Sequence, residues 1–168
     1  MTENNISDRG GLESRHTADA IDVIIRWHPK LAELYEADVM LVTAPLAPAQ
    51  AALAHAEAMA LAGPRSATAQ VGTPDGEPAA GALDQLALPD APGARAWSAY
   101  LEEVTGVFAE LLGARVVGVR QVVADGPHCP RFHVDRVMAR GVLNVLGACT
   151  EWIDDRDADR SRLGHAGG

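Results

Sequence analysis

The sequence lacks any apolar run close to the roughly 20 residues that a transmembrane helix needs, and its first residues lack the basic and apolar blocks of a signal peptide. It also lacks an excess of positive charge, because 14 basic residues stand against 23 acidic residues and give a formal net charge of −9. These absences argue against a membrane or a nucleic acid as the main partner. We therefore expect a soluble, cytoplasmic protein whose partner is a cation.

Cysteine is also scarce, since the chain contains only Cys129 and Cys149. Two cysteines are too few for a disulfide scaffold, and in a reducing compartment both are expected to be thiols. The sequence contains no Gly-rich phosphate loop, no Gly-x-Ser-x-Gly elbow and no Cys-x-x-Cys pair. The chemistry of the chain must therefore come from a less common arrangement of residues.

The chain has 168 residues, which fits one domain that buries roughly 70% of the surface its unfolded chain exposes. Residues 1–17 are polar with little periodicity and predict a disordered tail. Residues 18–168 predict a single α+β domain, which is mainly helical over 18–114 and β-rich over 115–168.

Helices are predicted in three segments of the first half. Residues 30–42 and 94–112 place apolar side chains at helical spacing, and residues 46–62 are rich in alanine, the best helix former. Gly113 is expected to cap the third helix at its C-terminal end. A short β-branched and aromatic run at 22–27 predicts a strand before the first helix.

The remaining segments predict a loop and two strands. Residues 63–93 hold many glycines and prolines and predict a long surface loop with one short turn near 83–88. The valine-rich segment 115–123 and the segment 137–146 predict strands on either side of a turn at 125–130. We expect these antiparallel strands to begin a partial jelly-roll or cupin-like barrel.

The segment CPRFHVD at 129–135 carries the candidate site. Residues i and i+2 of a strand point to the same face, so His133 and Asp135 are expected to offer one nitrogen and one oxygen to a single cation. Such a pair supplies two ligands of the 2-His-1-carboxylate triad that holds Fe(II), and only His165 follows as a further histidine. In the competing interpretation, Asp135 makes a turn contact and His133 forms hydrogen bonds within the fold.

Other side chains near this pair suggest a second metal ion and an organic co-substrate. With His128 and Cys129, the same segment also suits Zn²⁺, although a small buried thiol beside a proline is the plainer interpretation of Cys129. Arg120 and Arg131 are candidates for binding an oxoacid such as 2-oxoglutarate through a guanidinium fork. Surface arginines in solvent or in salt bridges are the alternative for both.

Four short motifs together resemble an uncharacterised bacterial family, the domain of unknown function 1826 family. They are CPRFHVD at 129–135, TEW at 150–152, DR at 159–160 and RLG at 162–164. The resemblance is specific over residues 115–164 and implies no established activity. This chain departs from the family in having Gly147-Ala148-Cys149 before TEW, where a Gly-x-Gly is typical. Similar proteins continue with further strands, so the resemblance implies a truncated chain.

Three functions remain open at this point. The first is an Fe(II)-dependent oxygenase, possible if the chain were complete, with His133 and Asp135 as metal ligands and 2-oxoglutarate as a possible co-substrate. The second is a non-catalytic zinc-binding protein. The third is an inactive remnant whose helical half survives as an interaction module. Because missing strands would leave apolar side chains and a sheet edge uncovered, we also expect self-association.

Overall fold

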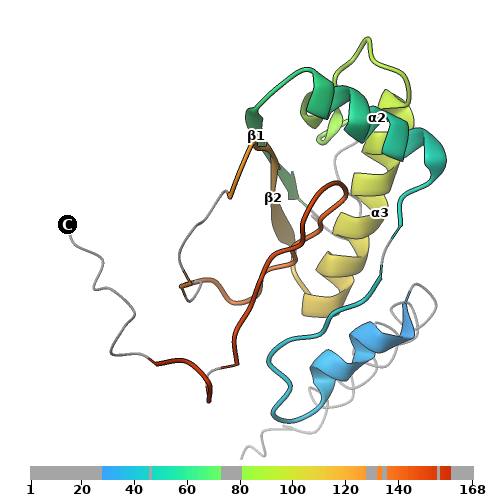
Figure 1. Ribbon diagram of the computed structural model, residues 1–168. Helices are drawn as coiled ribbons and strands as arrows, with labels where there is room; N and C mark the ends of the chain where they lie inside the picture. Colours follow the sequence, from blue (N-terminus) through green and yellow to red (C-terminus); the bar gives the residue numbers. More distant parts are fainter. Residues whose placement is uncertain are drawn as a thin grey trace, which may run out of the picture.

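A pair of α-helices packed on a small antiparallel sheet forms the centre of the protein, as described by a computed structural model (Figure 1). The structure describes residues 28–45, 47–72, 81–127, 132–133, 136–154 and 156–159. The predicted α+β class is confirmed by this mixture of helices and strands. The predicted tail at 1–17 and the predicted strand at 22–27 lie outside the described residues. No described helix has both the length and the apolar character needed to span a bilayer.

Both α-helices lie where the sequence predicts them. α2 (Gln50–Leu61) is rich in alanine, and α3 (Ala94–Leu112) repeats its apolar residues every three or four positions. α3 ends at Gly113, which adopts the left-handed region with φ 58°, and the N–H of Ala114 donates to the carbonyl of Ala109 over 2.8 Å. This is the bond of a Schellman cap, so the predicted role of Gly113 is confirmed.

The sheet pairs β1 (Arg65–Gly72) with β2 (Val116–Val123) in antiparallel register. The valine-rich β2 was predicted, but β1 falls within the segment 63–93 that was predicted to be a loop, and that prediction is wrong for residues 65–72. The sequence of β1, RSATAQVG, contains few of the bulky residues that mark a strand. The segment becomes a strand because it pairs with β2. The short turn predicted near 83–88 is confirmed by the 3-10 helix η2 (Asp84–Leu86).

Two adjoining clusters of the core lie on the inner side of the sheet. In the first, α2 presents Ala52, Ala56 and Met59 to Trp97 of α3. In the second, the inner face of β1 packs on Leu83 and Leu86, which flank and end η2. Because the α2 side chains at this contact are mostly alanines, the two helices can approach closely where α2 crosses the first half of α3 (Figure 1).

The first segment of the described chain forms the 3-10 helix η1 (Pro29–Tyr35). It lies at the end of α3, where Leu31 and Leu34 pack on Val107 and Leu111. The hydroxyl of Tyr35 donates to the carbonyl of Leu111 over 2.9 Å. Burial raises the pKa of this hydroxyl, and the nearby Glu110 carboxylate raises it further. The helix predicted over 30–42 is therefore correct only for its first part, and its geometry is 3-10.

Residues 136–154 follow an irregular path beside α3, and the strand predicted at 137–146 is wrong. Contacts with α3 help to hold this path. The ring of Phe108 lies against Gly141, where an added Cβ would sit 3.2 Å from it, and Val145 joins the cluster around Trp97. The valines and leucines of this segment mimic a strand in composition, but they have no neighbouring strand among the described residues. The sheet there has two strands and is not closed, so the predicted barrel is not formed by this part of the chain.

Candidate functional site

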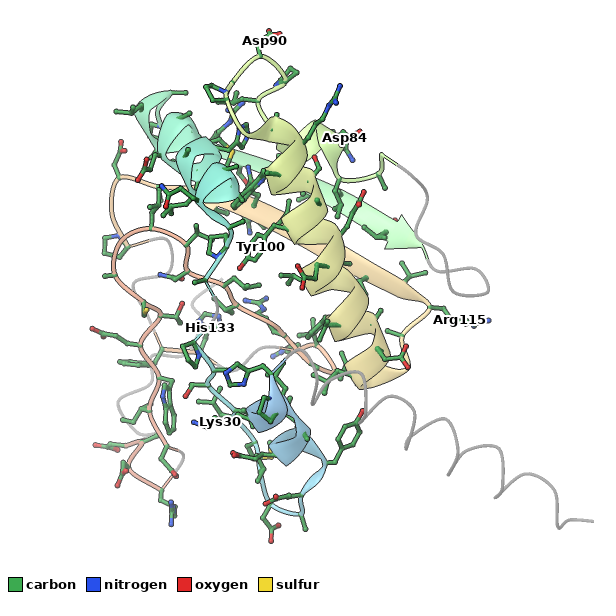
Figure 2. All side chains as sticks on the ribbon, turned by 90° about the vertical axis from the view of Figure 1, so that its right-hand side faces the viewer. Lys30, Asp84, Asp90, Tyr100, Arg115 and His133 are labelled. Carbon is green, nitrogen blue, oxygen red and sulfur yellow. The ribbon has the colours of Figure 1, made fainter. Side chains whose placement is uncertain are left out.

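His133 is the one residue of the predicted metal pair that the structure describes. It is exposed and lies after β2, in a segment with no regular secondary structure. Figure 2 shows it towards the end of the molecule at which α3 terminates, opposite the end that carries Asp90. Its predicted partner Asp135 lies outside the described residues, as do His128, Cys129 and Arg131. The expected strand is not formed at His133, and binding of one cation by His133 and Asp135 together stays a prediction.

No three side chains of histidine, cysteine, aspartate or glutamate converge on one point within the described part of the chain. The acidic run at 151–159 forms local contacts instead. There the carboxylate of Asp154 accepts two hydrogen bonds from the Arg156 guanidinium, at 3.1 and 2.8 Å. These bonds lower the pKa of Asp154 to about 2. Cys149 is a free and exposed thiol, as predicted.

Arg120 lies on the outer face of the sheet, directly opposite Thr68 in the register. Its side chain is exposed, and its Nε–H donates to the hydroxyl of Ser66 over 3.4 Å. Arg120 also lines a depression of about 460 Å³ on this face. The strand position predicted for Arg120 is confirmed, and its predicted role in binding an oxoacid stays a prediction.

His55 was assigned no chemistry from the sequence, and the structure gives it a structural role. The ring is completely buried, with Nδ1 3.0 Å from the carbonyl of Pro92 and Nε2 accepting the N–H of Leu88 over 3.1 Å. Because Nε2 accepts, the proton must sit on Nδ1 and donate to Pro92. His55 thus ties α2 to the segment that leads into α3. Its sequence neighbours, mostly alanines, give no signal of this.

A second polar side chain, the half-buried Gln121, joins three elements. Its Oε1 accepts the indole N–H of Trp97 over 2.8 Å, and its Nε2 donates to the carbonyl of Leu86 over 2.8 Å. Nε2 also lies 3.1 Å from the sulfur of Met59. Gln121 therefore links β2 to α3, to η2 and to α2. Beside it, Tyr100 stacks at a tilt on Trp97, and burial raises the pKa of its hydroxyl, with a smaller contribution from Glu103.

A family model described as "Protein of unknown function (DUF1826)" matches residues 27–167. The chain belongs to this family. The match confirms the resemblance carried by the motifs at 129–164, and it covers every residue that the structure describes. No curated protein and no solved structure matches the chain. For this DUF1826 member, the truncation implied by the motifs stays a prediction, and the description of the family states no activity.

Proposed function

We propose that this DUF1826 protein binds one divalent metal ion through His133 and Asp135, with Fe(II) preferred. The observation that carries the proposal is the density of ligands in one short segment. Residues 128–135 contain two histidines, a cysteine and an aspartate, each of which is a common metal ligand in proteins. This segment follows β2, and its described histidine, His133, is exposed to solvent, where an ion can reach it.

The third ligand decides what chemistry is possible. Two protein ligands hold an ion weakly, with most of its coordination sphere left to water. His128 would complete a 2-His-1-carboxylate set within the same segment, which suits Fe(II) oxygenase chemistry. Further strands of the jelly-roll expected from the sequence are another source of a third histidine. In either case Arg131, two residues before His133 in the sequence, is the candidate that we propose for holding the carboxylate of an oxoacid such as 2-oxoglutarate.

Calorimetric titration with Fe(II), Mn(II) and Zn(II) tests the assignment. We expect one ion per chain, and we expect His133→Ala or Asp135→Ala to lower the affinity about tenfold or more, because each removes a coordinate bond. Asp90→Asn is the matched control. It removes one exposed carboxylate at the other end of the molecule (Figure 2) and should leave the affinity unchanged. Micromolar binding that persists in the His133→Ala, Asp135→Ala double variant would contradict the proposal.

The same titrations separate an iron-type site from a zinc site. If zinc uses the thiol, Cys129→Ser should weaken zinc binding strongly, because a hydroxyl replaces thiolate poorly as a ligand. Binding of Fe(II) or Mn(II) should change little in this variant. Equal zinc affinity of the variant and the parent would exclude a thiolate ligand and leave His133 and Asp135 as the centre of the site.

A second function, self-association, is favoured by the exposed apolar side chains of the C-terminal segment. Eight large ones lie within residues 132–153. They are Phe132, Val137, Met138, Val142, Leu143, Leu146, Trp152 and Ile153. Apolar side chains gathered in this way commonly mark a surface that another protein covers. We propose that a second copy of the chain covers this surface.

Light scattering and a matched pair of variants check the self-association. We expect a mass above the 17.6 kDa of one chain, and about tenfold weaker association in Met138→Ser. Met40→Ser is the control, because Met40 is 93% exposed and Met138 is 94% exposed, but Met40 lies outside the segment. A monomeric parent with slow hydrogen exchange throughout residues 115–147 would show that the segment is fully packed within one chain, and would contradict this second function.

A further inference from the structure

The outer face of the sheet carries a hollow in its middle. Three paired positions of β1 and β2 line it, together with Gln85 of η2. The hollow exists because Gly118 has no side chain, and a Cβ added there would meet no atom within 4 Å. Its volume of about 460 Å³ falls in the range of small-molecule sites, roughly 300 to 1,000 Å³.

Among the described residues, the lining of the hollow combines apolar surface with several polar groups and one charged group. Thr68, Gln70 and Gln85 supply a hydroxyl and two amides, and Arg120 supplies a guanidinium, while no carboxylate of the described residues lines the space. The Arg120 Nε–H donates to Ser66, and within the described ranges no acidic side chain lies at ion-pair distance from Arg120. Within the same ranges, no group occupies the donors on its two terminal nitrogens, which can therefore serve a ligand.

An arginine with no acidic partner among the described residues is unusual on a chain with a net charge of −9. A guanidinium beside neutral hydrogen-bond donors is the arrangement that recognises a carboxylate through two parallel bonds. The other polar groups, Thr68 and Gln70, lie across the strand pair from Arg120 and Gly118, so they can reach a second polar group of the same molecule. The short length of the hollow, three residues along each strand, fits a small molecule rather than a polypeptide.

We infer that this hollow is a binding site for a small carboxylic acid, with Arg120 holding a carboxylate and Thr68, Gln70 and Gln85 holding its polar substituents. The site is built from residues other than those of the proposed metal site, and it does not depend on a metal. The ligand is held above Gly118, and the hydrogen bond to Ser66 restrains the guanidinium beside it.

Nuclear magnetic resonance titration of the whole chain with succinate tests the site directly. We expect saturable shifts of the amides of Thr68, Gln70 and Gly118 and of the Nε–H of Arg120, with a dissociation constant on the order of 1 mM for so open a site. Arg120→Gln should weaken binding about tenfold or more, since it removes the charge-assisted bonds. Gly118→Val should abolish binding by filling the hollow, in an extended segment where valine is favoured.

Two comparisons guard against general attraction of an anion. Arg115→Gln removes the same charge from an exposed arginine in the turn before β2 (Figure 2), and it should leave succinate binding unchanged. Succinamide, which has the same length but no charge, should bind at least about tenfold more weakly than succinate. The inference is overturned if Arg115→Gln and Arg120→Gln weaken binding equally, if succinamide binds as well as succinate, or if succinate shifts none of these resonances. It is likewise overturned if a short acidic peptide binds tenfold more tightly than succinate, which would identify a protein partner.

Discussion

Replacing Gly93 by alanine is expected to lower the free energy of unfolding by about 3 kcal/mol, from left-handed backbone strain of roughly 1–2 kcal/mol and overpacking of roughly 1–3 kcal/mol. Gly93 precedes α3 and adopts φ +78°, a region that favours glycine. An added Cβ would also collide with the carbonyl oxygen of Ala51 in the first turn of α2, and it would sit 3.3 Å from the Cβ of His55. Both obstacles are backbone or buried atoms, so neither can move cheaply.

Gly113→Ala is the matched control for this substitution. Gly113 also has a left-handed backbone, with φ +58°, but an added Cβ would meet nothing within 4 Å. The Gly113→Ala substitution should lower the free energy of unfolding only by the backbone strain, about 1 kcal/mol. Urea unfolding of both variants measures the difference, which reports the contact between the start of α3 and α2. Equal losses in the two variants would show that α3 does not begin against Ala51.

Replacing Gln121 by leucine is the second change with a large expected effect, and it should lower the free energy of unfolding by about 3 kcal/mol. The reason is that each buried group left without a hydrogen bond costs roughly 1–3 kcal/mol. Leucine nearly matches glutamine in size but bonds neither the indole N–H of Trp97 nor the carbonyl of Leu86. Both residues are buried, Trp97 in the first core cluster and Leu86 in the second. Gln70→Leu is the control, because Gln70 is exposed on the sheet's outer face, and it should change stability by less than about 0.5 kcal/mol.

A double-mutant cycle separates the hydrogen bond from the packing. Trp97→Phe removes the indole N–H, so the combined variant should be less destabilised than the sum of the single variants by about 1 kcal/mol. The indole proton of Trp97 gives a second readout, since its resonance should lose protection from exchange in Gln121→Leu. Strictly additive losses, with the indole proton still protected, would contradict the bond between Gln121 and Trp97.

The elements that the sequence predicts correctly are those whose signals are local. Alanine propensity marks α2, the three- and four-residue spacing marks α3, Gly113 marks its end, and valine content marks β2. β1 has no such signal, because its small and polar residues become a strand only by pairing with β2. The opposite error occurs at 137–146, where β-prone residues find no strand to pair with among the described residues. Strand identity in this protein is decided by tertiary pairing more than by composition.

The polar residues also differ in how much of their role could be predicted from the sequence. The position of Arg120 on a strand follows from the valines around it, and so its exposure on one face could be anticipated. The roles of His55 and Gln121 could not, because their partners lie 37 and 35 residues away in the sequence. Nothing in the sequence around His55 or Gln121 indicates that folding brings Pro92 to the histidine and Leu86 to the glutamine.

The pairing of β1 with β2 has a consequence for how the chain acquires its structure. The last residue of β1, Gly72, pairs with Val116, and the whole of η2 and α3 lies between them in the sequence. During synthesis, β1 therefore leaves the ribosome well before β2 has been made, and until then its backbone N–H and C=O groups have no strand to pair with. Contacts between distant parts of a chain form slowly, because a long loop must close first. In a growing chain, an unpaired strand of this kind is where association with other nascent chains can begin.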